Sequence, residues 1–286
     1  MSVKIITDST SYIDKDLRET LDIRILPLLI SFSDESIKEG EIENKEFYEK
    51  MEQKGIPVSS QPSIGEMYQE MVDVVSKGHD LVCIFLSSEM SGTFNSACKV
   101  KEAVLENYKD AKIHIIDSRS NSMQLGFVAI KAARAAKEGK SIEEIVSIAH
   151  DNIRKSRFLF IPDDLDYLKK GGRIGGASAL FGKMLKIIPV LTVKDGETAV
   201  FDKVRTKVRA IKTMVDKVLM DNKEYEIVEI VVHHINAYEE ARELAVDLKD
   251  KLNIPIPIVD IGPIIGMHVG PGSIGIAYYT NKDLTN

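Results

Sequence analysis

Short apolar runs alternate with segments of helical spacing through the first half of the chain. The runs Val3–Thr7, Leu81–Leu86 and Ile113–Ile116 are too short for helices and rich in β-branched residues, so each predicts a buried strand. Helical spacing follows in Phe94–Tyr108 and Ser122–Lys137. This alternation predicts an α/β fold, with a Rossmann-like, mostly parallel sheet covered on both faces. The other helices expected here are Asp14–Thr20, Lys45–Lys54, Ile64–Ser76 and Ser141–Ser156.

Two proline-containing segments of this half have local signatures. The apolar run Ile23–Phe32 contains Pro27, which predicts an edge strand. Ser63 and Glu66 have the spacing of a capping box that opens the helix after Pro62.

The pattern changes near residue 157. We expect a β-hairpin in which Lys186–Val193 and Glu197–Lys203 flank a Lys-Asp-Gly turn, within an α+β half. The boundary near residue 155 predicts two domains, residues 1–155 and 156–286. The remaining strands expected are Arg157–Ile161, Ile227–His233, Ile256–Ile261 and Ile274–Thr280. The remaining helices expected are Asp163–Lys170, Ala177–Leu185, Thr206–Asn222 and Ala237–Leu252. We expect a glycine-rich loop at Gly262–Gly275.

A cluster of hydroxyl groups follows the strand at Leu81–Leu86. It contains Ser87, Ser88, Ser91 and Thr93, with Gly92 among them. In an open α/β sheet, ligands bind at the carboxyl ends of strands, and free helix N–H groups there favour an anion. Helix capping by Ser91 or Thr93 is the equally weighted alternative.

Other polar residues also follow expected strands. Asp8 and Asp117 each begin an Asp-Ser turn, and capping of their own loops is the simpler interpretation. Ser59 and Ser60 precede a predicted helix and are free to face a cleft.

His268 lies in the apolar, glycine-rich segment near the end of the chain. A single histidine in such surroundings is commonly a core residue. The neighbouring glycines favour a ligand instead, because they allow a backbone to approach it closely. His233 and His234 are adjacent on a strand and point to opposite faces, which does not suggest a site.

Composition narrows the class of protein. Of 286 residues, 44% are hydrophobic and 29% charged, typical of a globular protein, and the net charge of -6 argues against a nucleic-acid partner. The 2 cysteines, Cys83 and Cys98, have no metal-site spacing. We find neither a signal peptide nor an apolar run of the roughly 18 residues that span a bilayer, so we expect a cytoplasmic protein without an integral membrane segment.

Two glycine-containing segments resemble nucleotide motifs without meeting their requirements. Gly270–Gly275 matches G-x-G-x-x-G but precedes a predicted strand instead of a helix, which argues against a dinucleotide site. At Gly182-Lys183 a P-loop would need Ser or Thr next, where the chain has Met184. Serine-hydrolase elbows and metal-ligand spacings are also missing, so we expect no cofactor and no metal.

Taken together, these motifs resemble the DegV family, the fatty-acid-binding subunits of bacterial fatty-acid kinase. Their order and spacing along the whole chain carry the resemblance. The matching segments are Thr7–Thr10, Ser59–Pro62, Leu86–Ser88, Ser91–Thr93, Asp117–Ser118, Gly172–Ile174, Lys203–Lys207 and Gly262–Gly270.

The resemblance implies an N-terminal Rossmann-like domain, a C-terminal α/β domain and a fatty acid between them. Ser91 would contact the fatty-acid carboxylate, Ser59 stands where the family commonly has Thr, and His268 would support the same network. Arg205 and Arg173 match basic residues linked to the carboxylate end and to the kinase subunit. We expect Ser60, Gly92 and Thr93 to complete the site.

The family resemblance also implies the partners. An ATP-dependent kinase subunit would phosphorylate the bound fatty acid, and a downstream acyltransferase would use the acyl phosphate for phospholipid synthesis. This chain would then be a carrier without catalytic residues of its own. The alternatives are an acyl-transfer or hydrolytic enzyme with Ser91 as nucleophile and His268 as base, and a lipid-regulated sensor.

Overall fold

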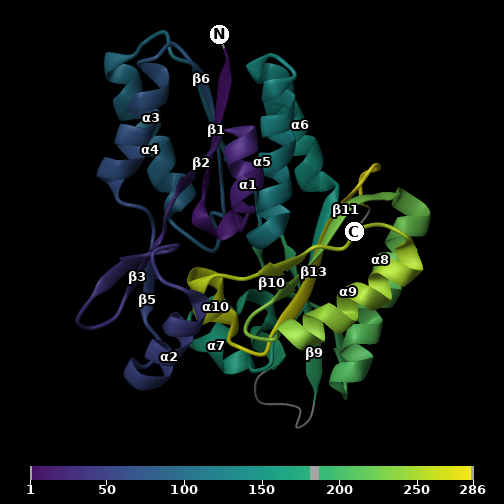
Figure 1. Cartoon of the computed structure of the whole chain (residues 1–286). Helices are drawn as coiled ribbons and strands as arrows, with labels where there is room; N and C mark the ends of the chain where they lie inside the picture. The colour runs from purple at the N-terminus through teal and green to yellow at the C-terminus, as the bar shows by residue number, and fades with distance from the viewer. Residues whose placement is uncertain (1, 181–186, 285–286) are drawn as a thin grey trace. The chain divides into compact units, whose positions relative to one another are not determined.

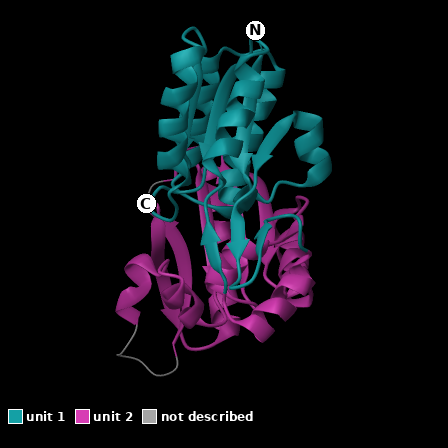
Figure 2. Cartoon of the chain, turned by 90° about the vertical axis from the view of Figure 1, so that its left-hand side faces the viewer, with its two compact units in different colours: residues 1–42, 57–153 teal, residues 43–56, 154–286 magenta. Residues whose placement is uncertain are grey.

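The computed structural model describes residues 2–180 and 187–284. The chain forms two compact units, coloured separately in Figure 2. Unit 1 consists of residues 1–42 and 57–153, and unit 2 of residues 43–56 and 154–286. The chain thus leaves unit 1 after residue 42, contributes residues 43–56 to unit 2, and returns to unit 1 at residue 57. Within unit 2, the side chain of Asn44 donates a hydrogen bond to the carbonyl of Ile261 (3.1 Å). The domain limits 1–155 and 156–286 stay a prediction.

Unit 1 is built on four parallel strands in the order β2-β1-β6-β7. Their bounds are β1 Val3–Asp8, β2 Ile23–Leu26, β6 Asp80–Phe85 and β7 Ile113–Asp117. β6 is buried along nearly its whole length because helices cover both faces of the sheet. The predicted parallel α/β architecture is confirmed.

Helices α3 and α4 lie on one side of β1 and β6, and α5 lies on the other (Figure 1). Met67 and Met71 of α3 and Val100 of α4 pack on the sheet residues Leu81 and Phe85. Ser63 caps α3 by accepting from the N–H of Glu66 (3.1 Å), as the capping box predicts. The helices of this part of the chain are η1 Ser9–Ser11, α1 Lys15–Leu21, α3 Ile64–Val75, α4 Thr93–Asn107, α5 Ser122–Lys137 and α6 Ile142–Arg154.

A small antiparallel sheet, ordered β4-β3-β5, also belongs to unit 1. Its strands are β3 Leu29–Ser31, β4 Ser36–Lys38 and β5 Val58–Ser60. The single strand predicted for Ile23–Phe32 is therefore wrong. Pro27 has no N–H for a ladder, and the run is split into β2 at the edge of the parallel sheet and β3 in the small sheet.

Unit 2 contains a mixed sheet in the order β10-β9-β8-β13-β11-β12. Its strands are β8 Ser156–Ile161, β9 Ile188–Lys194, β10 Glu197–Val204, β11 Ile227–His234, β12 Ile258–Asp260 and β13 Ile274–Thr280. The predicted hairpin is β9 and β10. Asp195 (φ 52°) and Gly196 (φ 86°) form its turn with positive φ at both positions, as a tight two-residue hairpin requires.

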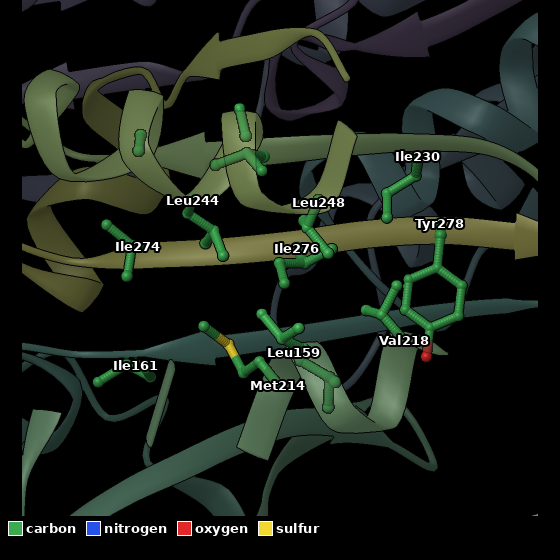
Figure 3. Close-up of a cluster of buried hydrophobic side chains, with 14 of the residues drawn as sticks. Leu159, Ile161, Met214, Val218, Ile230, Leu244, Leu248, Ile274, Ile276 and Tyr278 are labelled. Atoms are coloured by element: carbon green, nitrogen blue, oxygen red, sulfur yellow. The ribbon is translucent and has the colours of Figure 1, made fainter. Parts of the chain in front are cut away.

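The two long helices α8 and α9 cover one face of this sheet, and Figure 3 shows the core that results. Sheet residues two apart, such as Ile274, Ile276 and Tyr278, point to the same face and meet Met214 and Val218 from consecutive turns of α8. The helices of unit 2 are α2 Asn44–Lys54, α7 Leu165–Lys170, η2 Gly175–Leu180, α8 Lys207–Tyr225, α9 Tyr238–Leu252 and α10 Pro263–Val269.

Two predictions for unit 2 need correction. The segment from Ala177 is a 3₁₀ helix that spans Gly175–Leu180, and the rest of the predicted helix, with Gly182 and Lys183, lies outside the described residues. The loop expected at Gly262–Gly275 contains α10, which Pro263 opens at a first helical position and Gly270 ends with φ 88°. Among the described residues, no helix is both long and apolar enough to cross a bilayer.

Candidate functional site

The polar loops of unit 1 meet at the carboxyl ends of the parallel strands. Since β1, β6 and β7 run in the same direction, the segments that follow them lie at the same end of the sheet. The hydroxyl-rich segment after β6 comes from the middle of the three strands, because the order is β1-β6-β7. Ligands of open α/β sheets bind at this end.

The turn formed by Ser91, Gly92 and Thr93 begins helix α4. Ser91 Oγ accepts from the backbone N–H of Thr93 (3.3 Å), and the two hydroxyl groups share a hydrogen bond (2.9 Å). Ser91 therefore accepts from the first N–H of the helix, although it stands one residue before the N-cap residue, Gly92. The helix itself starts after Gly92, without a side-chain cap and without an acidic residue in its first turn. The partial positive charge at the N-terminus of α4 is thus not compensated by an acidic residue in the first turn.

Gln61 connects the Ser59–Ser60 segment to this turn. Its Oε1 accepts from Ser96 Oγ of α4 (2.8 Å), and a Cβ added to Gly92 would lie 2.8 Å from the same atom. Ser59 and Ser60 lie directly before Gln61 on β5, with Ser59 partly buried and Ser60 exposed. The structure therefore links both predicted hydroxyl segments through a residue to which the sequence analysis assigned no role.

Asp8 and Asp117 cap their own loops and also contact the segment after β6. Asp8 accepts from the N–H of Thr10 (2.9 Å), as Asp117 does from that of Arg119 (2.8 Å), which confirms the simpler interpretation. In addition, Asp8 accepts from the N–H of Leu86 (2.7 Å). Asp117 likewise accepts from the N–H of Ser88 (3.3 Å).

The carboxyl group of Asp8 is fully buried. Burial raises its pKa from 3.8 to about 6, against the opposing effect of hydrogen bonds from Thr10 and Leu86. Thr10 donates through both its N–H and its hydroxyl group, the latter at 2.5 Å. These partners are neutral donors, and within residues 2–180 and 187–284 no cation is paired with this carboxyl group.

Arg119 brings a positive charge to the same end of the sheet. It adopts φ 55°, and its guanidinium donates to Ser88 Oγ (3.3 Å) and Glu89 (3.1 Å) and lies 3.5 Å from Asp117. A non-glycine residue adopts this left-handed backbone conformation only where the surrounding structure holds it there. No sequence signal distinguishes this residue from any other loop arginine.

His268 lies in unit 2, on helix α10 near its C-terminus. It is buried, and burial together with the positive charge of Arg173 lowers its pKa to about 4. The imidazole is therefore neutral near pH 7 and has one N–H to donate. Its ring approaches Gly171 so closely that a Cβ there would collide with Nδ1, and Tyr48 of α2 approaches Gly266 of the same helix in a similar way.

The basic residues predicted for the site have different environments. Arg173 is partly buried, donates to the carbonyl of Gly171, and acts electrostatically on His268. Arg205 is exposed between β10 and α8. The structure therefore associates Arg173 with His268 in unit 2 and groups the hydroxyl residues in unit 1.

His233 and His234 have structural surroundings. His233 packs edge-on against Phe158 with ring centroids 5.4 Å apart, and burial lowers its pKa to about 3. His234 lies 3.4 Å from Asp260. In the described part of the chain, no group of three or more histidine, cysteine or acidic residues is arranged to hold a metal ion.

Comparisons with known proteins identify close relatives. The model of the DegV family, described as a family of uncharacterised proteins, matches residues 2–281. A DegV domain-containing protein of Clostridium acetobutylicum is 59% identical over 99% of this chain and 100% of its own length.

Solved structures of similar fold carry a ligand description. The crystal structure of DegV from Bacillus subtilis, described as a fatty acid binding protein, has a TM-score of 0.88 and 32% identity over 98% of this chain and 99% of its own. A stearic-acid-binding protein from Eubacterium ventriosum also has a TM-score of 0.88, with 28% identity over 98% of both chains.

Proposed function

Because the chain belongs to the DegV family, we propose that it binds a long-chain fatty acid and holds the carboxylate at the turn of Ser91, Gly92 and Thr93. The observation that carries this proposal is the N-terminus of α4, which offers hydroxyl and backbone donors without an acidic residue in its first turn. Helix N-termini of this kind favour an anion. The description of the Bacillus subtilis and Eubacterium ventriosum proteins as fatty-acid binders supports the choice of anion.

The energetics of a fatty acid suit neutral donors. Burial of an acyl chain contributes about 0.8 kcal/mol per CH₂, so its apolar part supplies ample gross affinity. Burial of a neutral polar group without a partner costs about 2–7 kcal/mol, and burial of an ionised carboxylate costs far more, so hydrogen bonds must compensate for the lost water. Ser59, Ser60 and the neutral imidazole of His268 are the further donors that we assign to the carboxylate. The location of the acyl channel between the two halves of the chain stays a prediction.

We assign the chemistry to a partner. An ATP-dependent kinase subunit would transfer a phosphoryl group: a carboxylate oxygen forms the bond to the γ-phosphorus, and the bond to the leaving ADP oxygen breaks. This chain would present the fatty acid and retain the acyl phosphate for a downstream acyltransferase. Arg205, which is exposed, is the residue that we assign to contact with the kinase, with Arg173 beside His268.

Native mass spectrometry of the freshly purified protein tests the binding function. We expect a retained mass of a fatty acid of about 14–18 carbons, whose long apolar chain favours tight binding. Ser91→Ala combined with Ser59→Ala should weaken binding of added palmitate. Ser63→Ala is the matched control, because it removes the cap of α3 and should leave palmitate binding unchanged.

Other results would favour other functions. A covalent acyl adduct on Ser91, or ester hydrolysis that Ser91→Ala abolishes, would favour the enzyme alternative. Protein that is free of ligand and binds no added fatty acid would contradict the proposal. With the kinase subunit present, Arg205→Ala should reduce acyl phosphate formation more than palmitate binding.

A further inference from the structure

The segment that carries the proposed anion-binding turn is held from both neighbouring strands. β6 lies between β1 and β7. Asp8, the last residue of β1, accepts from the N–H of Leu86, and Asp117, the last residue of β7, accepts from the N–H of Ser88. Both N–H groups belong to the segment that leads from β6 to Ser91.

These two contacts exceed what local capping requires. The backbone pairing of β1 with β6 ends at Thr7 and Ile84, so the Leu86 N–H lies beyond the regular ladder. The side chain of Asp8 replaces a backbone acceptor there. An aspartate that only closed its own loop would need no bond to the neighbouring strand's continuation.

The two carboxylate oxygens of Asp8 accept hydrogen bonds from different parts of the chain. Oδ1 accepts from the N–H and the hydroxyl group of Thr10, whereas Oδ2 accepts from Leu86. An asparagine of the same shape has only one oxygen, so it leaves one of the two backbone N–H groups without an acceptor in either orientation. The arrangement therefore requires a carboxylate and not merely a polar side chain.

We propose that Asp8 and Asp117 are positioning residues, which hold residues 86–93 in the conformation that binds the fatty-acid carboxylate. This inference rests on the proposed function. Asp8 should have the larger effect, because it is fully buried and its bond to the turn segment is shorter (2.7 Å against 3.3 Å). Neither residue contacts the ligand, and each acts through the turn.

Titration with the fluorescent fatty acid cis-parinaric acid, displaced by palmitate, tests this role. We expect Asp8→Asn to weaken binding about tenfold and Asp117→Asn about threefold, since each loses a charge-assisted hydrogen bond. Asp14→Asn is the matched control. Asp14 also accepts from two backbone N–H groups, those of Asp16 and Leu17, but it is exposed at α1.

A double-mutant cycle separates positioning from general destabilisation. If Asp8 acts through Ser91, then Asp8→Asn should weaken binding less than about twofold in a protein that already carries Ser91→Ala. Effects that simply multiply would overturn the inference, as would an equal loss in Asp14→Asn. Should Asp8→Asn fail to fold, Asp117→Asn enters the same cycle.

A spectroscopic comparison of the wild type with Ser91→Ala completes the test. The backbone amide signals of Leu86 and Ser88 in NMR spectra should shift when palmitate is added, and these shifts should shrink in Ser91→Ala. Signals that do not move would overturn the positioning role while palmitate binding itself still supports the proposed function. A protein that binds neither palmitate nor cis-parinaric acid would contradict both.

Discussion

Asp8 of unit 1 and Asp221 of unit 2 are both fully buried, but their partners differ. Asp8 receives hydrogen bonds from neutral donors of Thr10 and Leu86. Asp221 lies within 3.0 Å of Arg157 and 2.8 Å of Lys217, and it accepts from the hydroxyl group of Tyr278 (2.6 Å). Hydrogen bonds from neutral groups therefore stabilise the carboxylate of Asp8, whereas two cations compensate the charge of Asp221.

The difference matches the roles of the two places. Asp221 lies on the buried side of α8 and joins it to β8 and β13, so its network stabilises a core. Burial and the charge of Asp221 raise the pKa of Tyr278 well above its usual value, which keeps that phenol a hydrogen-bond donor. Asp8 lies at the carboxyl end of β1, at the end of the sheet where we propose that an anion binds.

The largest effect is expected from Asp221→Ala. Removing this acid leaves Arg157 and Lys217 without their buried partner, and such losses cost about 3–5 kcal/mol of unfolding free energy. Urea denaturation measures it. Asp216→Ala on the same helix is the control, because its pair with Lys212 is exposed and should contribute less than about 1 kcal/mol. Similar losses in both variants would remove the distinction drawn for Asp221.

Asp8→Asn should change how stability depends on pH. The folded pKa of about 6 exceeds the ordinary 3.8, so Asp8 stabilises the folded state below pH 3.8 and this contribution is lost as the pH rises through about 6. The unfolding free energy of the wild type, relative to Asp8→Asn, should therefore fall by about 2–3 kcal/mol between ~pH 4 and ~pH 7. Urea denaturation at several pH values measures the difference. A constant difference across this range would show that Asp8 does not titrate there.

Gly266→Ala tests the tight packing around α10 in unit 2. The added methyl group collides with the hydroxyl end of Tyr48, and overpacking of a buried site costs about 1–3 kcal/mol of unfolding free energy. Thermal and urea denaturation measure the loss. Tyr48→Phe, which removes the colliding oxygen, should restore part of the stability in the double variant. No restoration would mean that α10 is not held by this contact.

Gly92→Ala in unit 1 should cost less, about 1 kcal/mol. The new methyl group meets only the end of the flexible Gln61 side chain, which can move away by giving up its hydrogen bond with Ser96. Gly65→Ala is the matched control. Apart from the adjacent residues and the backbone of its own helix, no atom lies within 4 Å of a Cβ there, so alanine at this second position of α3 should not destabilise the protein. A loss at Gly92 as large as that at Gly266 would contradict the contrast between adaptable and rigid surroundings.

Much of the fold could be predicted because one periodicity dominates each segment. The apolar run Leu81–Leu86 predicts β6, the amphipathic spacing after it predicts α4, and Ser63 with Glu66 marks the start of α3. Helix α10 escaped because six of its seven residues are buried, so no alternation of polar and apolar positions remained to be read. The proline at its first position was the available signal.

What the sequence by itself determined is which residues have chemistry to offer: the hydroxyl cluster after β6, the Asp-Ser turns, and His268. Only the tertiary structure decided which partners they meet. The bonds from Asp8 to Leu86 and from Asp117 to Ser88 depend on β6 lying between β1 and β7, and residues 43–56 join unit 2 although their neighbours in the chain belong to unit 1. The physical reason is that local spacing sets the direction of a side chain, whereas its neighbours depend on strand order and on packing between distant segments.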